Sequence, residues 1–111
     1  MIQKRSVSIP PVTYDDGWKI LRNGFKPYAC CRSIHATVDA ARKLAAQLDG
    51  RAVARVQVKA PRGATVSAHH VDLKMPLQGK FSFPFCVALG LRGYAVVEAD
   101  FSHERLGTRQ E

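Results

Sequence analysis

The sequence contains no apolar run of the length that a membrane-spanning helix needs, and its first eleven residues form no apolar signal-peptide segment. Acidic residues are few: 9 Asp and Glu stand against 17 Lys and Arg in 111 residues, which gives a formal net charge of +8. No glycine-rich phosphate loop, paired-carboxylate motif or Gly-x-Ser-x-Gly element is present. We therefore expect a cytoplasmic protein without a membrane partner, and outside several common enzyme classes.

The composition is that of an ordinary globular domain, with 46% hydrophobic and 23% charged residues. A chain of this length forms one domain with a modest core. Its basic balance suits either nucleic acid or small polyanionic substrates. The basic residues are scattered rather than gathered in a dense run, so most of the charge is expected on a solvated surface.

The three cysteines, Cys30, Cys31 and Cys86, do not form the even-numbered framework of a secreted disulfide protein, so reduced thiols are expected. Cys30, Cys31 and His35 provide candidate zinc ligands, but structural zinc sites separate their cysteines by two to four residues. No metal site is therefore predicted. Either adjacent cysteine could be a nucleophile with a lowered pKa, although packing is the simpler interpretation, and Cys86 is expected in the core.

Two segments carry helical signals. The first covers about residues 33–48, where apolar residues recur along one stripe: Ile34, Val38, Ala41, Ala45 and Leu48. Ser33 is its expected N-cap, and Asp49–Gly50 its end. The second follows Ser82, a capping residue with Pro84 in the first turn. Its segment is apolar all round, which predicts a buried helix.

Alternation over Ala54–Lys59 predicts a half-buried strand that ends at Pro61. Shorter strands are expected at Trp18–Leu21 and Tyr94–Val97. We therefore predict an α+β fold in which a small sheet packs against two main helices. Residues 1–16 are expected to be an extended, partly disordered lead-in, residues 17–105 the folded part, and residues 106–111 a frayed tail.

Cationic side chains gather around the start of the first predicted helix, at Lys26, Arg32 and His35. Free N–H groups and the helix dipole favour a carboxylate or phosphate there. Arg32, His35 and Asp39 share one face, and Asp39 lies one turn from His35, where its carboxylate can orient the ring and keep it basic. This pattern predicts an anion-binding or proton-transfer site; the alternative is a solvated polar face with one ordinary pair of neighbours.

Two separate blocks also carry the signature of a known family. The first includes Phe25–Tyr28, Cys31–Arg32, His35 and Asp39–Ala40, and the second includes Phe81–Phe85 and Val87–Ala88. In this order and spacing the sequence resembles the MmgE/PrpD family, which includes 2-methylcitrate dehydratase, cis-aconitate decarboxylase and an iminodisuccinate epimerase.

The resemblance implies the smaller α+β C-terminal domain of that family, which packs against a large all-helical domain. Family members are several times longer, and the helical domain supplies most of their catalytic residues. No metal or organic cofactor is implied. The implied roles are catalysis by Lys26 and His35, substrate binding by Arg32, Lys26 and Ser82, and support from Asp39 and Phe85.

The sequence thus predicts a fragment of a lyase- or epimerase-type enzyme that acts on small polycarboxylates and is inactive alone. The alternative is a small basic binding or interaction module without catalysis, for nucleic acid or for a separate helical subunit. Nucleic-acid binding is disfavoured because the aromatic residues lie in apolar blocks. The expected partners are a polycarboxylate, a helical-domain partner and a second copy of the chain.

Overall fold

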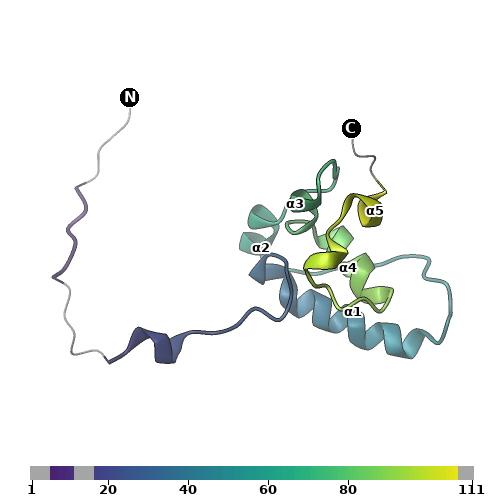
Figure 1. The fold of residues 1–111 in the computed structure, drawn as a ribbon, viewed down its shortest axis with the longest axis horizontal. Coiled ribbons are helices and arrows are strands. Elements are labelled where there is room, and N and C mark those ends of the chain that lie inside the picture. Colours follow the sequence, from purple (N-terminus) through teal and green to yellow (C-terminus); the bar gives the residue numbers. More distant parts are fainter. Residues whose placement is uncertain (1–5, 12–16, 108–111) are drawn as a thin grey trace.

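The computed structural model describes residues 6–11 and 17–107, and the elements named here lie within those ranges (Figure 1). Two helices form the body: α1 (His35–Leu48) and α4 (Phe83–Leu91). Three shorter helices are α2 (Arg62–Ser67), α3 (Pro76–Gly79) and α5 (His103–Leu106). Three 3-10 turns complete the order: η1 (Lys19–Arg22), η2 (Arg32–Ile34) and η3 (Glu98–Asp100).

Helix α1 forms where the apolar stripe predicts it. Ile34 and Val38 are completely buried and Ala41 nearly so. The helix ends at Asp49, which adopts the left-handed conformation and is followed by Gly50 with φ of +74°. The predicted N-cap was wrong: Ser33 lies within η2, and its Oγ is 3.1 Å from the Cys31 Sγ.

Helix α4 begins as its sequence predicts. The Ser82 Oγ accepts a hydrogen bond from the Phe85 N–H at 3.3 Å, and Pro84 occupies the first turn, where no N–H is needed. Its apolar composition is matched by burial of Phe83, Cys86, Val87, Leu89 and Gly90. The helix packs against α1 along the centre of the body.

The predicted α+β fold was wrong, because the described residues contain no strand and no sheet. Their one β-type contact is an isolated antiparallel bridge between His69 and Ser82. Residues 52–60 run without any backbone hydrogen bond to another described residue, although Ala54–Lys59 alternates like a strand. Alternation alone cannot supply the neighbouring strand that a ladder requires.

The two shorter predicted strands were also wrong. Lys19–Arg22 forms the 3-10 turn η1. Val96, within Tyr94–Val97, has φ of +59°, which no strand residue adopts. The expected lead-in and tail lie largely outside the described residues.

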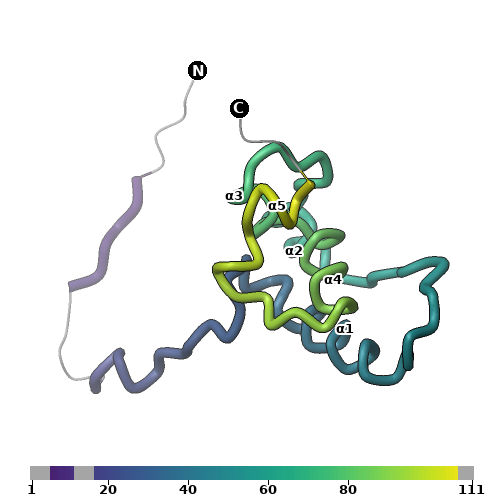
Figure 2. Tube along the Cα trace, turned by 45° about the vertical axis from the view of Figure 1, so that its right-hand side comes forward, coloured from purple at the N-terminus to yellow at the C-terminus, as the bar shows by residue number. Residues whose placement is uncertain are grey.

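Residues 17–25 form an arm that projects away from the helices, as Figures 1 and 2 show from two directions. The radius of gyration is 18.6 Å, whereas a compact domain of this size has about 13 Å. The chain enters the core at Tyr28, which is buried together with Cys30. The arm therefore lies outside the body that the helices form.

Gly90 marks the closest approach of α4 to α1. A Cβ atom at this position would lie 3.0 Å from the Ala41 Cβ and 3.4 Å from the Val38 carbonyl oxygen. We expect Gly90→Ala to lower the free energy of unfolding by about 1–2 kcal/mol, because crowding outweighs the gain in helix propensity. Gly63→Ala is the matched control, since a Cβ there meets nothing within 4 Å. Urea denaturation showing both variants equally stable would contradict this close approach.

Candidate anion-binding cleft

A cleft of about 630 Å³ lies beside the loop that leads into α1. Three segments form its walls: the loop of residues 26–32, α3 with the two residues after it, and the start of η3 with the residue before it. Three cationic side chains, one carboxylate and two aromatic rings are among its lining groups: Lys26, Arg32, Lys80, Glu98, Tyr28 and Phe81.

Two backbone hydrogen bonds fix the loop between the other walls. The Ala29 N–H donates to the Val96 carbonyl at 3.0 Å, and the Cys31 N–H donates to the Lys80 carbonyl at 2.8 Å. Both join residues that are far apart in the sequence. The lining residues of the loop are therefore held by the fold, rather than by the loop's own conformation.

The cations of the cleft differ in how far they are already neutralised. Lys80 Nζ forms an ion pair with the Glu98 carboxylate at 2.6 Å. Arg32 Nη1 donates to the Phe25 carbonyl, at 3.4 Å, and Lys26 is exposed. Glu98 thus balances one cation, and Lys26 and Arg32 provide the charge available to an anionic ligand.

His35 is separated from the cleft lining. It is buried in the core, where its Nε2 lies 3.1 Å from the Cys30 carbonyl oxygen. The His35 and Tyr28 rings form a T-shaped pair with their centres 5.3 Å apart. Asp39 accepts a hydrogen bond from the Tyr28 hydroxyl. His35 therefore supports the loop from behind, and the catalytic role implied for it stays a prediction.

Ser82 and Phe85 are also engaged elsewhere. Ser82 is 1% exposed and its Oγ caps α4. The Phe85 ring packs against Phe101 at 5.8 Å between ring centres. Of the predicted site residues, the structure brings Lys26 and Arg32 together in the cleft and places the others outside its lining.

Lys80, Glu98 and Tyr28 belong to this cleft although sequence reasoning gave them no role. Tyr28 stood within the first family block, and Lys80 directly precedes the second. Lys80 lies close to the loop of Tyr28 because the Cys31 N–H donates to the Lys80 carbonyl, a contact that no local sequence pattern indicates.

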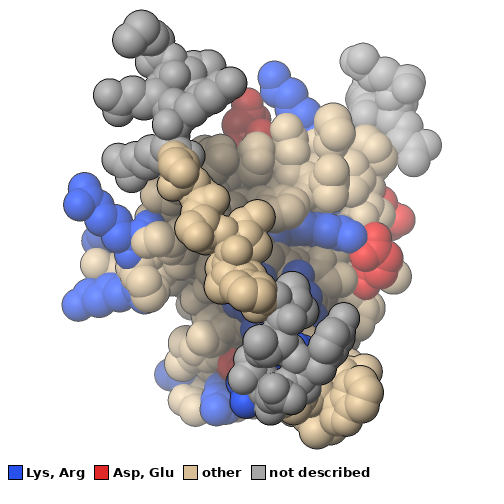
Figure 3. Space-filling view, turned by 90° about the vertical axis from the view of Figure 1, so that its left-hand side faces the viewer, with Lys and Arg blue, Asp and Glu red and all other residues tan. Residues whose placement is uncertain are grey.

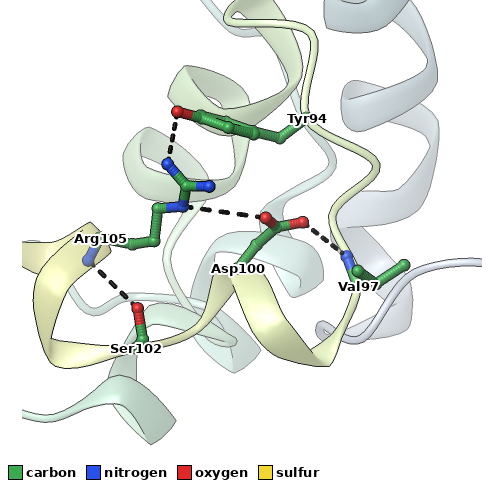
Figure 4. A network of polar contacts seen from close by, with 5 residues as sticks. All are labelled: Tyr94, Val97, Asp100, Ser102 and Arg105. Atoms are coloured by element: carbon green, nitrogen blue, oxygen red, sulfur yellow. Dashed lines mark hydrogen bonds and ion pairs between the residues drawn. The ribbon is translucent and has the colours of Figure 1, made fainter.

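A polar network around η3 holds this wall of the cleft in place (Figure 4). The Asp100 carboxylate accepts the Val97 N–H at 3.0 Å and pairs with Arg105 Nε at 3.9 Å. Arg105 also donates to the Tyr94 hydroxyl, and its backbone N–H donates to the Ser102 Oγ. Because Val97 and Glu98 line the cleft, this network positions one of its edges.

The three cysteines differ in their surroundings. The hydrogen bond with Cys30, together with burial, raises the pKa of the Cys86 thiol, while the same hydrogen bond lowers the pKa of Cys30. Cys31 is only partly buried and lines the cleft. Burial acts to raise the pKa of Cys31, but hydrogen bonds from Ser33 and Ser67 and the charge of Lys26 outweigh it, so the pKa lies below its usual value.

Within the described ranges, no group of three or more His, Cys, Asp or Glu side chains is arranged to hold a metal ion. His69 and His70 stack on each other at 4.6 Å between ring centres. None of the described helices has the length and apolar character needed to cross a membrane.

Comparison with known families identifies the chain. The model described as the MmgE/PrpD C-terminal domain matches residues 28–110, and the chain therefore belongs to the MmgE/PrpD family. The match begins at Tyr28, so the arm and Lys26 lie outside it. Searches of curated proteins and of solved structures found no match.

We predict that Cys31 is the first thiol to react with iodoacetamide, because Cys30 and Cys86 are buried whereas Cys31 is only partly so, and because its lowered pKa increases the reacting thiolate form at neutral pH. The alkylation rate of Cys31 should reach half-maximum at a lower pH than that of N-acetylcysteine. The Ser67→Ala variant should shift this pH midpoint to a higher pH, because the Ser67 hydrogen bond lowers the pKa of Cys31. Mass spectrometry of peptides over a pH series measures both. Equal labelling of Cys30 and Cys31 in the folded protein would contradict the prediction.

Proposed function

We propose that this chain provides the substrate-side part of a lyase- or epimerase-type enzyme of the MmgE/PrpD family that acts on small polycarboxylates. The observation that carries the proposal is the placement of Lys26 and Arg32 on one cleft, beside a loop that two long-range backbone hydrogen bonds hold in place. Membership of the family supports the reaction class.

The two cations suit a carboxylate in different ways. Arg32 presents a planar fork that can hold both oxygens of one carboxylate, whereas Lys26 provides a compact charge. Figure 3 views the face from which the arm projects, and Lys and Arg side chains stand at several places around it. Together with the net charge of +8, this surface favours the approach of an anionic substrate.

The proposed chemistry is removal of a proton beside a carboxylate, followed by elimination, decarboxylation or inversion. A positioned base removes the proton, and cations stabilise the charge that develops. In this chain Lys26 and Arg32 bind and orient the anion, and His35 holds the loop through the Cys30 carbonyl. The remaining catalytic groups are proposed to come from a separate helical partner.

Lys26→Gln and Arg32→Gln should each weaken binding of citrate or tricarballylate about 10–100-fold, since a charge-assisted hydrogen bond contributes about 1.5–3 kcal/mol. Isothermal titration calorimetry at low salt measures this loss. Arg55→Gln is the matched control, because it removes an equal charge from an exposed position away from the cleft lining. An equal loss in all three variants would show that affinity follows net charge and not this site.

The chain alone should not dehydrate, decarboxylate or epimerise citrate-like or aconitate-like acids, because the described cleft offers cations and a thiol but no free carboxylate base: Glu98 is paired with Lys80. Proton NMR of incubations at high protein concentration measures product formation and loss of stereochemistry. Lys26→Ala is the control for contaminating activity. Turnover that this variant abolishes would overturn the division of labour proposed here.

A further inference from the structure

The cleft beside α1 contains a carboxylate of its own. Glu98, at the start of η3, and Lys80, directly after α3, both line the cleft. The Lys80 Nζ donates a hydrogen bond to the Glu98 Oε2 at 2.6 Å. A short, charge-assisted contact of this kind is also what a ligand carboxylate makes with a lysine. Glu98 therefore occupies one of the three cationic groups that the lining offers to an anion.

The two partners of this ion pair differ in how firmly they are held. The Lys80 side chain is 24% exposed, and its Nζ lies 5.8 Å from the centre of the Phe101 ring. Its backbone carbonyl accepts the Cys31 N–H at 2.8 Å. The Glu98 side chain is 77% exposed. The fold thus holds the cation in place, whereas the carboxylate stands in solvent and can turn away from it.

The wall of the cleft does not depend on this ion pair. An exposed ion pair contributes little to the stability of a fold. Separate contacts fix η3: the Asp100 carboxylate accepts the Val97 N–H at 3.0 Å and pairs with Arg105. What the pair changes is the charge inside the cleft, because it balances one cation and leaves Lys26 and Arg32 to an anionic ligand.

Exposed hydrocarbon also lines the cleft. Leu77 is 58% exposed, Phe81 is 38% exposed and Val97 is 46% exposed. Binding sites for small molecules combine apolar walls of this kind with a few polar groups that fix the orientation of the ligand. The lining therefore suits a ligand with a short aliphatic backbone between charged ends.

We propose that Glu98 is a specificity-determining residue that restricts the cleft to dicarboxylates. Lys26 and Arg32 bind two carboxylates, and Glu98 keeps Lys80 from binding a third. The inference rests on the proposed function, because it takes the same cleft as the substrate site. It narrows the substrate class from small polycarboxylates to dicarboxylates with a short aliphatic backbone.

A third carboxylate on the ligand meets an obstacle on either route. If it displaces Glu98 from Lys80, one charge-assisted contact replaces another and little affinity is gained. If Glu98 stays in place, the third carboxylate lies close to a group of the same charge. A site can reject a competing ligand through a repulsive group of this kind. A dicarboxylate that binds to Lys26 and Arg32 avoids both costs.

Glutarate and tricarballylate are matched probes, because they share a three-carbon backbone and differ in the central carboxylate. Isothermal titration calorimetry with the full chain in 150 mM NaCl screens the field of distant charges. The unmodified chain should bind the two acids with dissociation constants within about threefold of each other. Glu98→Gln should tighten tricarballylate about tenfold or more, since Lys80 becomes available, and glutarate less than threefold.

Two further variants separate this local effect from a general change in charge. Glu104→Gln removes an equal charge from an exposed residue of α5 outside the cleft lining, and should leave the ratio of the two affinities unchanged. In a Lys80→Gln background, Glu98→Gln should no longer favour tricarballylate, because the cation that it frees is missing. A preference that persists in this background would overturn the proposal. Circular dichroism checks that each variant folds.

The outcomes show which proposal fails. If neither acid binds the unmodified chain or the Glu98→Gln variant, the cleft is no carboxylate site, and the proposed function fails together with this inference. If both acids bind and Lys26→Gln weakens both, but Glu98→Gln leaves their ratio unchanged, only the role of Glu98 is overturned. Tenfold tighter binding of tricarballylate than of glutarate by the unmodified chain would also overturn that role, because a third carboxylate would then bind despite Glu98.

Discussion

Two backbone hydrogen bonds hold the loop of residues 28–31 between distant parts of the chain, and the cleft depends on them. One partner is the carbonyl of Val96, a fully buried residue in the left-handed region at φ of +59°. A β-branched residue adopts this backbone at a cost, and here the burial of its side chain offsets that cost. The position of the loop that leads to Arg32 is thus set by packing in the core rather than by surface contacts.

The cleft and an apolar groove between α1, α4 and residues 56–59 are lined by different parts of the fold. The loop before α1 presents cations, while the opposite side of α1 and the end of α4 present aliphatic carbon. The two helices that line the groove pack tightly on each other at Gly90. The linings of the cleft and the groove differ in chemistry: the cleft presents charged side chains, and the groove presents aliphatic ones.

Much of the helical structure follows from local sequence. The burial of Val38 on α1 and the cap at Ser82 are read directly from apolar spacing and from side-chain chemistry. The strand predicted at Ala54–Lys59 failed because strand formation depends on a neighbour that the pattern does not contain. The surroundings of His35 could not be predicted for a related reason: helical spacing places it beside Asp39, but its burial against Tyr28 depends on tertiary packing.

The unpaired segment of residues 52–60 has a consequence for how this chain avoids uncontrolled association. An extended backbone with free N–H and C=O groups is a template for another strand. Arg55 and Lys59 alternate along it with Val56 and Val58, so two such edges laid together would bring like charges into register. Pairing of two copies along this segment is therefore disfavoured, because it would place like charges side by side.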